Sequence, residues 1–260
     1  MDGTYEGDKG IEYKINGQSD EQTVEDSKTA LDEVVTVNGG SYPAGSKELI
    51  TALLDATNNN IVDDNGNVVA DSSKSEAAIG SIGYDTLDEA ITAATSGDTI
   101  VLQKDVKSDT RITIPAGVTL NGNNHSITYT GSDQASGAFI TVETNGDDVA
   151  IQNVTISTGD NGDEWNYAVQ FYCVDGGSMT GVTVKGGEYA AVIVNGAQNI
   201  VLTNCRLDPY SNAYANIEYA MGSGVTTIPS LTVDGVTGDS DKPMVRADTG
   251  TVTNMKTAMG

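Results

Sequence analysis

The phrase Ile151-Gln152-Asn153-Val154-Thr155-Ile156 decides the fold, because it recurs through the second half of the chain. It reads apolar, polar, Asn or Gly, apolar, polar and usually apolar. The other copies are Met179–Val184, Leu202–Leu207, Val233–Gly238 and Val252–Thr257, and the last two lack the final apolar residue. A strand-forming phrase that returns every 20 to 30 residues or so is typical of a solenoid, whose stacked coils bury one continuous core.

A second strand is expected before each phrase: Phe139–Val142, Val169–Tyr172, Ala191–Val194, Ile217–Tyr219 and Met244–Arg246. Most of these strands run into Asn-Gly or Asp-Gly, which tolerate the left-handed backbone of a tight corner. Two strands per coil with a glycine corner between them predict an all-β fold, a parallel β-helix.

Aligning these strands on their turns predicts one outward row of Val142, Tyr172, Val192, Glu218 and Arg246. Glu218 and Arg246 would then form a cross-strand ion pair between neighbouring coils. The three apolar or aromatic members would give a packing seam for a homo-oligomer, with a trimer as the expected state.

The pattern resembles the right-handed β-helix of the pectate-lyase-like superfamily over roughly residues 82–260. The segments Tyr84–Ile100 and Ile112–Gly122 also resemble, respectively, the helix-cap opening and an early coil of bacterial surface proteins with β-helix domains. The resemblance implies a right-handed parallel β-helix with an N-terminal capping helix over residues 81–260. It also implies a relationship to large, often adhesive proteins.

The expected capping helix has its own sequence signals. Thr86 and Glu89 form a capping box, in which each side chain satisfies a free amide of the other residue. Leu87, Ala90, Ile91 and Ala94 share one helical face, Gly97 ends the helix, and a strand over Thr99–Leu102 follows.

Residues 34–80 predict a small α+β unit that serves for attachment or as a cap. We expect a strand at Val34–Val37 and a helix over Leu49–Leu54 that is capped by Ser46. Ile61-Val62 and Val68-Val69 predict a hairpin around Asp63–Asn67. Residues 1–33 hold ten Asp or Glu against three Lys, and we expect this acidic segment to be extended or partly disordered.

The formal net charge of −24 restricts the partners. Such a chain repels phosphates, so nucleic acid is not expected as a partner, and the charge also argues against anionic membranes and unaided capture of polyanions. Solubility or calcium loading would explain the charge. Because the chain lacks an apolar run of 18 residues, no membrane insertion is expected, and the acidic start at Met1–Thr4 is not a signal peptide.

The sequence predicts no catalytic residues. His125 is the only histidine, so any His-dependent nucleophile or zinc site would have to use it. Cys173 and Cys205 fit either a disulfide or, preferably, two buried thiols. A polysaccharide lyase of the superfamily would need clustered carboxylates for calcium and a Lys or Arg base, and none of its catalytic motifs is found here.

Two long loops carry the candidate ligand-binding residues. The loops Thr158–Tyr167 and Asp208–Tyr214 contribute Trp165, Tyr167, Tyr210 and Tyr214. Aromatic faces beside polar groups hold sugars or anchor protein partners, but they equally cover the flank of a core. In the first loop, Asp160, Asp163 and Glu164 bring together three carboxylates that suit calcium, although the spacing is not that of an EF-hand.

These observations favour a non-enzymatic display protein on a virion, as a capsid decoration or fibre, or on a bacterial cell surface. Its partners would be further copies of itself and a protein or carbohydrate surface. No cofactor is required under this hypothesis, and calcium is the one ion considered. The alternative is a calcium-dependent polysaccharide lyase or hydrolase of the pectate-lyase-like type.

Overall fold

The computed structural model describes residues 36–131, 135–142, 146–159, 165–221, 225–247 and 250–251. The chain divides into two compact units, Met1–Thr86 and Leu87–Gly260. The acidic segment at residues 1–33 and the fifth phrase at residues 252–257 lie outside the described residues.

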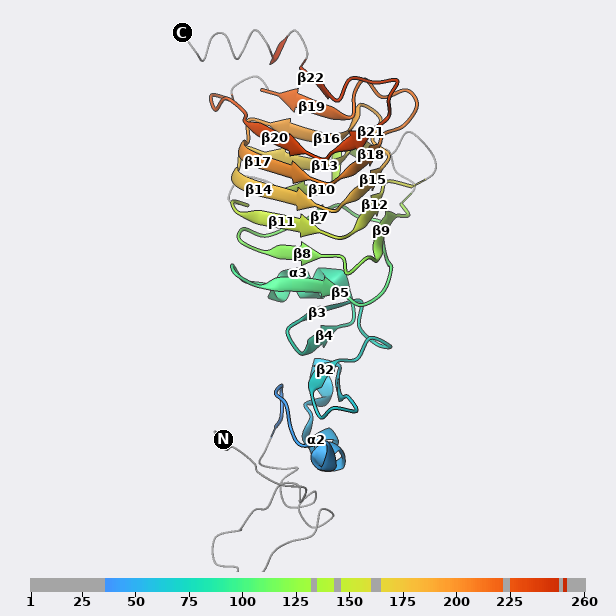
Figure 1. Cartoon of the computed structure of the whole chain (residues 1–260), viewed down its shortest axis with the longest axis vertical. Coiled ribbons are helices and arrows are strands. Elements are labelled where there is room, and N and C mark those ends of the chain that lie inside the picture. The colour runs from blue at the N-terminus through green and yellow to red at the C-terminus, as the bar shows by residue number, and fades with distance from the viewer. Residues whose placement is uncertain are drawn as a thin grey trace, which may run out of the picture. The chain divides into compact units, whose positions relative to one another are not determined.

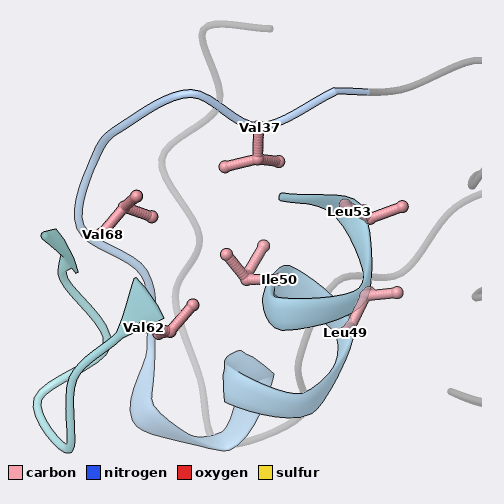
Figure 2. Close-up of a cluster of buried hydrophobic side chains, with 6 residues drawn as sticks. All are labelled: Val37, Leu49, Ile50, Leu53, Val62 and Val68. Atoms are coloured by element: carbon pink, nitrogen blue, oxygen red, sulfur yellow. The ribbon is translucent and has the colours of Figure 1, made fainter. Parts of the chain in front are cut away.

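The first unit is a small α+β structure with its own core. It contains, in order, η1 (Ala44–Ser46), α2 (Lys47–Leu53), η2 (Ala56–Asn58), β1 (Asn60–Val62), β2 (Val68–Ala70), β3 (Ala77–Ile79) and β4 (Ile82–Tyr84). The predicted helix and hairpin are confirmed as α2 and as the antiparallel pair β1–β2. Figure 2 shows the core side chains, which are Val37, Leu49, Ile50, Leu53, Val62 and Val68.

Two details of this unit differ from the sequence-based expectation. Ser46 makes no side-chain capping hydrogen bond, because its backbone is already helical and its hydroxyl is buried. In the expected strand Val34–Val37, the described part contributes only an isolated bridge between Val37 and Leu54.

The second unit is built from parallel sheets (Figure 1). Sheet I contains β7 (Ile112–Thr113), β10 (Ala135–Val142), β13 (Trp165–Tyr172), β16 (Ala190–Asn195), β19 (Ile217–Ala220) and β22 (Val245–Arg246). Sheet II contains β5 (Thr99–Leu102), β8 (Thr119–Asn121), β11 (Val149–Gln152), β14 (Asp175–Thr180), β17 (Gln198–Thr203) and β20 (Leu231–Asp234). Sheet III contains β6 (Val106–Ser108), β9 (Ser126–Tyr129), β12 (Thr155–Ser157), β15 (Thr183–Lys185), β18 (Arg206–Asp208) and β21 (Thr237–Gly238).

Chain order takes one strand from each sheet in turn, so every coil contributes three strands to three parallel walls. Equivalent side chains of successive coils therefore stack in register and fill the space between the walls. The fully buried columns are Ile140, Val169, Val192 and Ile217 in sheet I; Leu120, Ile151, Met179 and Leu202 in sheet II; and Ile127, Ile156, Val184 and Leu207 in sheet III. The unit is thus mostly β, with a β-helix-like arrangement of its parallel strands.

The prediction of two strands per coil was wrong, because the recurring phrase covers two strands and the corner between them. The corner residues Asn153, Gly181, Asn204 and Gly235 have φ angles of 49°, 63°, 51° and 61°. These left-handed residues turn the chain from sheet II into sheet III. A single corner residue bends the backbone without interrupting the apolar pattern on either side.

The predicted outward row was also wrong in register. Val142 pairs with Phe171, and Val192 pairs with Val169. Both valines are completely buried, so they cannot form an exterior seam. Only the neighbour relation between Glu218 and Arg246 is confirmed.

At the start of the second unit, α3 (Leu87–Ala93) buries Leu87 and Ala90. The following strand β5 has the predicted bounds, and Figure 1 shows α3 beside it. Among the described residues, no helix has the length and apolar character needed to cross a membrane.

Candidate functional site: a tyrosine row beside sheet I

Three tyrosines from successive coils lie where the chain enters sheet I. Tyr167 is on β13, Tyr189 directly precedes β16, and Tyr214 is in the loop before β19. The Tyr167 and Tyr189 rings meet edge to face, with centroids 5.9 Å apart and an interplanar angle of 84°. Tyr189 and Tyr214 are stacked, at 5.5 Å and 29°. We call these residues the tyrosine row.

Arg246, from the next coil, continues the tyrosine row. Its guanidinium carbon lies 4.8 Å from the centroid of the Tyr214 ring, which is a cation–π distance. Tyr214 therefore contacts an aromatic ring from the coil before it and a guanidinium group from the coil after it. Tyr214 is nevertheless 54 % exposed, so part of the residue is open to solvent.

The backbone of the entry loops fixes the rings. The amide of Tyr189 donates to the carbonyl of Asn166 at 2.8 Å, and the amide of Tyr214 donates to the carbonyl of Tyr189 at 2.8 Å. Gly187 has a φ of 97°, and a Cβ there would overlap the carbonyl oxygen of Ala190. The short loop before β16 therefore needs glycine to bring Tyr189 into the row.

Trp165 lies apart from the tyrosine row. It is only 3 % exposed and meets Tyr129 edge to face at 5.4 Å. The Arg111 guanidinium lies over its ring at 5.3 Å, and its buried indole N–H has no hydrogen-bond partner among the described residues. The structure thus places Trp165 in the flank of the core, where its ring faces are not offered to a ligand.

Tyr210 also lies apart from the row and links two loops that are two coils apart. Its hydroxyl donates to the carbonyl of Gly159 at 2.7 Å and accepts from the hydroxyl of the buried Thr158 at 3.0 Å. Gly186 belongs to the coil between these two loops, and a Cβ there would crowd both Thr158 and Tyr210. Both hydroxyl bonds of Tyr210 are therefore used to hold one loop against another.

Of the four candidate ligand-binding residues, the structure brings together Tyr167 and Tyr214, through Tyr189. Sequence reasoning missed Tyr189 because it selected residues from long loops, whereas Tyr189 follows a short one. Tyr189 could have been found from its position in the coil, since Tyr189 and Tyr214 both lie shortly before a sheet I strand.

The carboxylates proposed for calcium, Asp160, Asp163 and Glu164, lie outside the described residues. Within the part of the chain that the structure describes, no three His, Cys, Asp or Glu side chains gather closely enough to hold a metal ion.

His125 lies beside a carboxylate, and both cysteines are unpaired thiols. His125 Nδ1 lies 3.6 Å from Asp105 Oδ1. Hydrogen bonding from the backbone amide of Ser126, more than the nearby imidazole, lowers the pKa of Asp105. Cys173 and Cys205 are both free thiols, and burial raises the pKa of the Cys205 thiol, so Cys205 fits an inert core residue.

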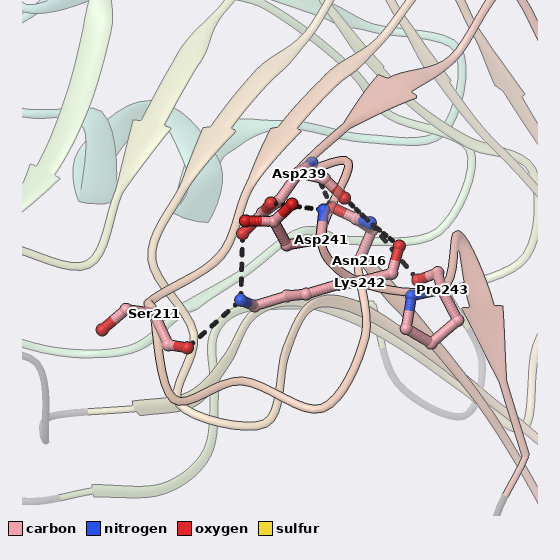
Figure 3. Close-up of polar contacts among 6 residues, drawn as sticks. All are labelled: Ser211, Asn216, Asp239, Asp241, Lys242 and Pro243. Atoms are coloured by element: carbon pink, nitrogen blue, oxygen red, sulfur yellow. Dashed lines mark hydrogen bonds and ion pairs between the residues drawn. The ribbon is translucent and has the colours of Figure 1, made fainter.

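A polar cluster closes the loop that leads into β22 (Figure 3). Asn216, which is 1 % exposed, accepts from the amide of Asp239 at 2.7 Å and donates to the carbonyls of Asp239, Lys242 and Pro243. Lys242 Nζ lies 2.9 Å from Asp239 Oδ2 and donates to the carbonyl of Ser211 at 3.1 Å. These contacts hold the last described coil against the one before it.

Comparison with known proteins gives little further information. No family model matches the chain, and no curated protein matches it. A crystal structure of a candidate glycosyl hydrolase from Parabacteroides merdae is 12 % identical and covers 61 % of this chain and 84 % of its own, with a TM-score of 0.14. A likeness at that level carries no argument about fold or activity.

Proposed function

We propose that this protein is a non-enzymatic display protein, carried on a virion as a capsid decoration or fibre, or on a bacterial surface. In this proposal its second unit is a right-handed parallel β-helix of the pectate-lyase-like type, capped by α3, and acts as a stiff spacer. The first unit attaches or extends it.

The observation that supports this proposal is the use of side chains on the flanks of the sheets to couple one coil to another. Tyr214 contacts Tyr189 of the coil before and Arg246 of the coil after, and the Tyr210 hydroxyl joins loops that are two coils apart. Side chains committed to such contacts suit a rigid rod, and the exposed edges of the tyrosine row leave a strip for a protein or carbohydrate partner. A homo-oligomer, of which a trimer is one state to test, stays part of the proposal, but Val142 and Val192 do not supply its interface.

Surface labelling tests the display role. Antibodies raised against the full chain should label intact virions or cells of the source organism without permeabilisation. Labelling that requires lysis would overturn the proposal. As a control, mild protease treatment of whole cells should remove the labelling while an internal protein stays intact.

A calcium-dependent polysaccharide lyase is the second candidate, because Glu218 and Arg246 are register neighbours on sheet I. Acidic polysaccharides incubated with calcium would then give an unsaturated product with ultraviolet absorbance. We expect no unsaturated product. If the wild-type protein forms this product and Glu218→Ala or Arg246→Ala does not, the protein is a lyase.

A further inference from the structure

Asn-Gly pairs recur along this chain, and they are chemically reactive as well as suited to tight corners. In such a pair the glycine nitrogen lies close to the side-chain amide of the preceding asparagine and can attack it within the same chain. The pairs that lie wholly within the described residues are Asn38-Gly39, Asn65-Gly66, Asn121-Gly122 and Asn195-Gly196.

The first of these pairs differs from the others at the glycine nitrogen. In the other three, the glycine N–H donates to a backbone carbonyl: Gly66 to Asp63 at 3.1 Å, Gly122 to Gln152 at 2.7 Å, and Gly196 to Ala220 at 2.9 Å. The N–H of Gly39 donates to none of the described residues. Because the nitrogen must lose its proton and approach the side chain, a hydrogen bond from the N–H slows the attack, and Gly39 lacks this restraint.

The Asn38 side chain is placed to be attacked. Asn38 is exposed, so water reaches it. Its Oδ1 accepts a hydrogen bond from Asn58 Nδ2 at 3.0 Å. Negative charge develops on this oxygen when a nucleophile adds to Cγ, and a donor already in place stabilises that charge. Asn38 Nδ2, the leaving group, donates to none of the described residues.

We propose that Asn38 is a site of spontaneous deamidation. The Gly39 nitrogen bonds to Asn38 Cγ while the bond from Cγ to Nδ2 breaks, and Nδ2 leaves as ammonia with the proton of the Gly39 amide. The product is a succinimide ring, which one water molecule opens. Cleavage at Cγ gives aspartate, and cleavage at the main-chain carbonyl carbon gives isoaspartate. Water is the only co-reactant.

Isoaspartate at this position loosens the first unit, because it adds a methylene group to the main chain. The segment is held on both sides of Asn38. The core residue Val37 donates to the carbonyl of Leu53 at 2.8 Å, and the Gly40 carbonyl accepts from the amide of Val68 at 2.8 Å. A longer main chain cannot keep both bonds in the same register, so the segment separates from α2 or from β2 as the protein ages.

The test is peptide mapping by mass spectrometry of the full chain, incubated in its folded state in mildly alkaline buffer. Trypsin releases residues 29–47, in which Asn38 is the only asparagine, and residues 48–74, in which fragment masses locate Asn65. Asn65 is the matched control, because it is also exposed and precedes glycine, but the Gly66 N–H is bonded. We expect Asn38 to deamidate about tenfold faster than Asn65, which corresponds to about 1.4 kcal/mol in the barrier.

The same measurement in urea removes the structural difference between the two pairs. Their rates should then agree within about twofold, since both segments are unfolded. Equal rates in the folded protein, or a difference that persists in urea, would overturn the proposal.

Hydrogen exchange at the Val68 amide tests the loosening. Exchange should accelerate as isoaspartate accumulates. Freshly purified Asn38→Asp, which carries the new charge without the longer main chain, should exchange like fresh wild type. Aged protein that is rich in isoaspartate but exchanges at the fresh wild-type rate would overturn the loosening of the first unit.

Discussion

Gly187 is the residue on which the entry of Tyr189 into the tyrosine row depends. Its φ is 97°, and an added Cβ would overlap the carbonyl oxygen of Ala190. We expect Gly187→Ala to destabilise the fold by about 2–4 kcal/mol, because backbone strain and a backbone clash act together. Urea unfolding, followed by tyrosine fluorescence, measures this change.

Gly97 provides the control for strain without the clash. Its φ is 96°, almost that of Gly187, but a Cβ there meets no atom within 4 Å. Gly97→Ala should therefore cost only the strain, about 1–2 kcal/mol. Equal losses in the two variants would show that the contact with Ala190 has no effect.

Asp239 connects stability to pH. The hydrogen bond from the Lys242 ammonium group is the largest cause that lowers the pKa of this carboxyl below its usual range. A carboxyl whose pKa is lower in the folded state stabilises the fold at pH values above its unfolded-state pKa, which is about 4. This stabilisation is lost as the pH falls through the folded-state pKa. Asp239→Asn should therefore be less stable than wild type at neutral pH.

The difference between Asp239→Asn and wild type should shrink as pH falls from about 4 through the lowered folded-state pKa, since the carboxylate is protonated first in the unfolded state and then in the folded state. Urea unfolding of both proteins across this range is the measurement. Asp105 and Asp98 also have lowered pKa values, so acid should destabilise both proteins, and only their difference reports on Asp239. A difference that stays constant with pH would contradict the assignment.

Helices and strands could be predicted from the sequence where the spacing of apolar residues changes between two elements. They could not where the same spacing runs on from one strand into the next. The helix starting at Leu87 and the strand Thr99–Leu102 could be predicted, since capping residues and Gly97 mark their ends. The third sheet could not, because Asn153 and its equivalents turn the chain with one residue.

The candidate site could likewise be predicted only in part from the sequence. Sequence order could show that aromatic residues cluster near coil entries, but not which ring faces which. That depends on register, and a shift of one residue moved the predicted row from the exterior to the core at Val142. It also hid the burial of Trp165, whose ring the Arg111 guanidinium covers from two coils earlier.

Asn216 holds the loop that leads into β22, the last strand of sheet I. Its side chain satisfies the amide of Asp239 and three carbonyls while almost fully buried. Asn216→Ala leaves these groups unpaired and should cost about 1–3 kcal/mol. Amide hydrogen exchange should accelerate first over residues 239–246, because this loop loses its anchor.

The exposed Asn212, in the same loop as Tyr214, is the matched control. Asn212→Ala should change stability by less than about 0.5 kcal/mol and leave exchange over residues 239–246 unaltered. If Asn216→Ala behaves in the same way, the polar cluster does not hold the last coil in place.

For the whole molecule, stacking and charge act in opposite directions. Each added coil extends the buried columns and stabilises its neighbour. The formal net charge of −24 on a chain of 260 residues, however, favours expansion through self-repulsion. Because the two units have separate cores, their unfolding transitions can differ, and each should be followed by its own probe.

Screening the charge should therefore stabilise the protein. Raising NaCl from about 0.01 M to 0.15 M shortens the screening length from about 30 Å to 8 Å. We expect Tm to rise by a few degrees, since about 1 kcal/mol shifts the Tm of a domain of this size by roughly 2–4 °C. Differential scanning calorimetry measures it, with KCl as the control for sodium binding. A Tm that falls or stays constant would mean that self-repulsion is not limiting.

Calcium can be separated from this general effect by adding about 1 mM CaCl2 or MgCl2 at 0.15 M NaCl. A specific site stabilises the folded state by mass action, whereas screening treats the two divalent cations alike. The carboxylates Asp160, Asp163 and Glu164 predict a rise in Tm with calcium alone, which the triple change to Asn, Asn and Gln should abolish. Equal shifts with both cations would leave charge screening as the whole explanation and remove calcium from the proposal.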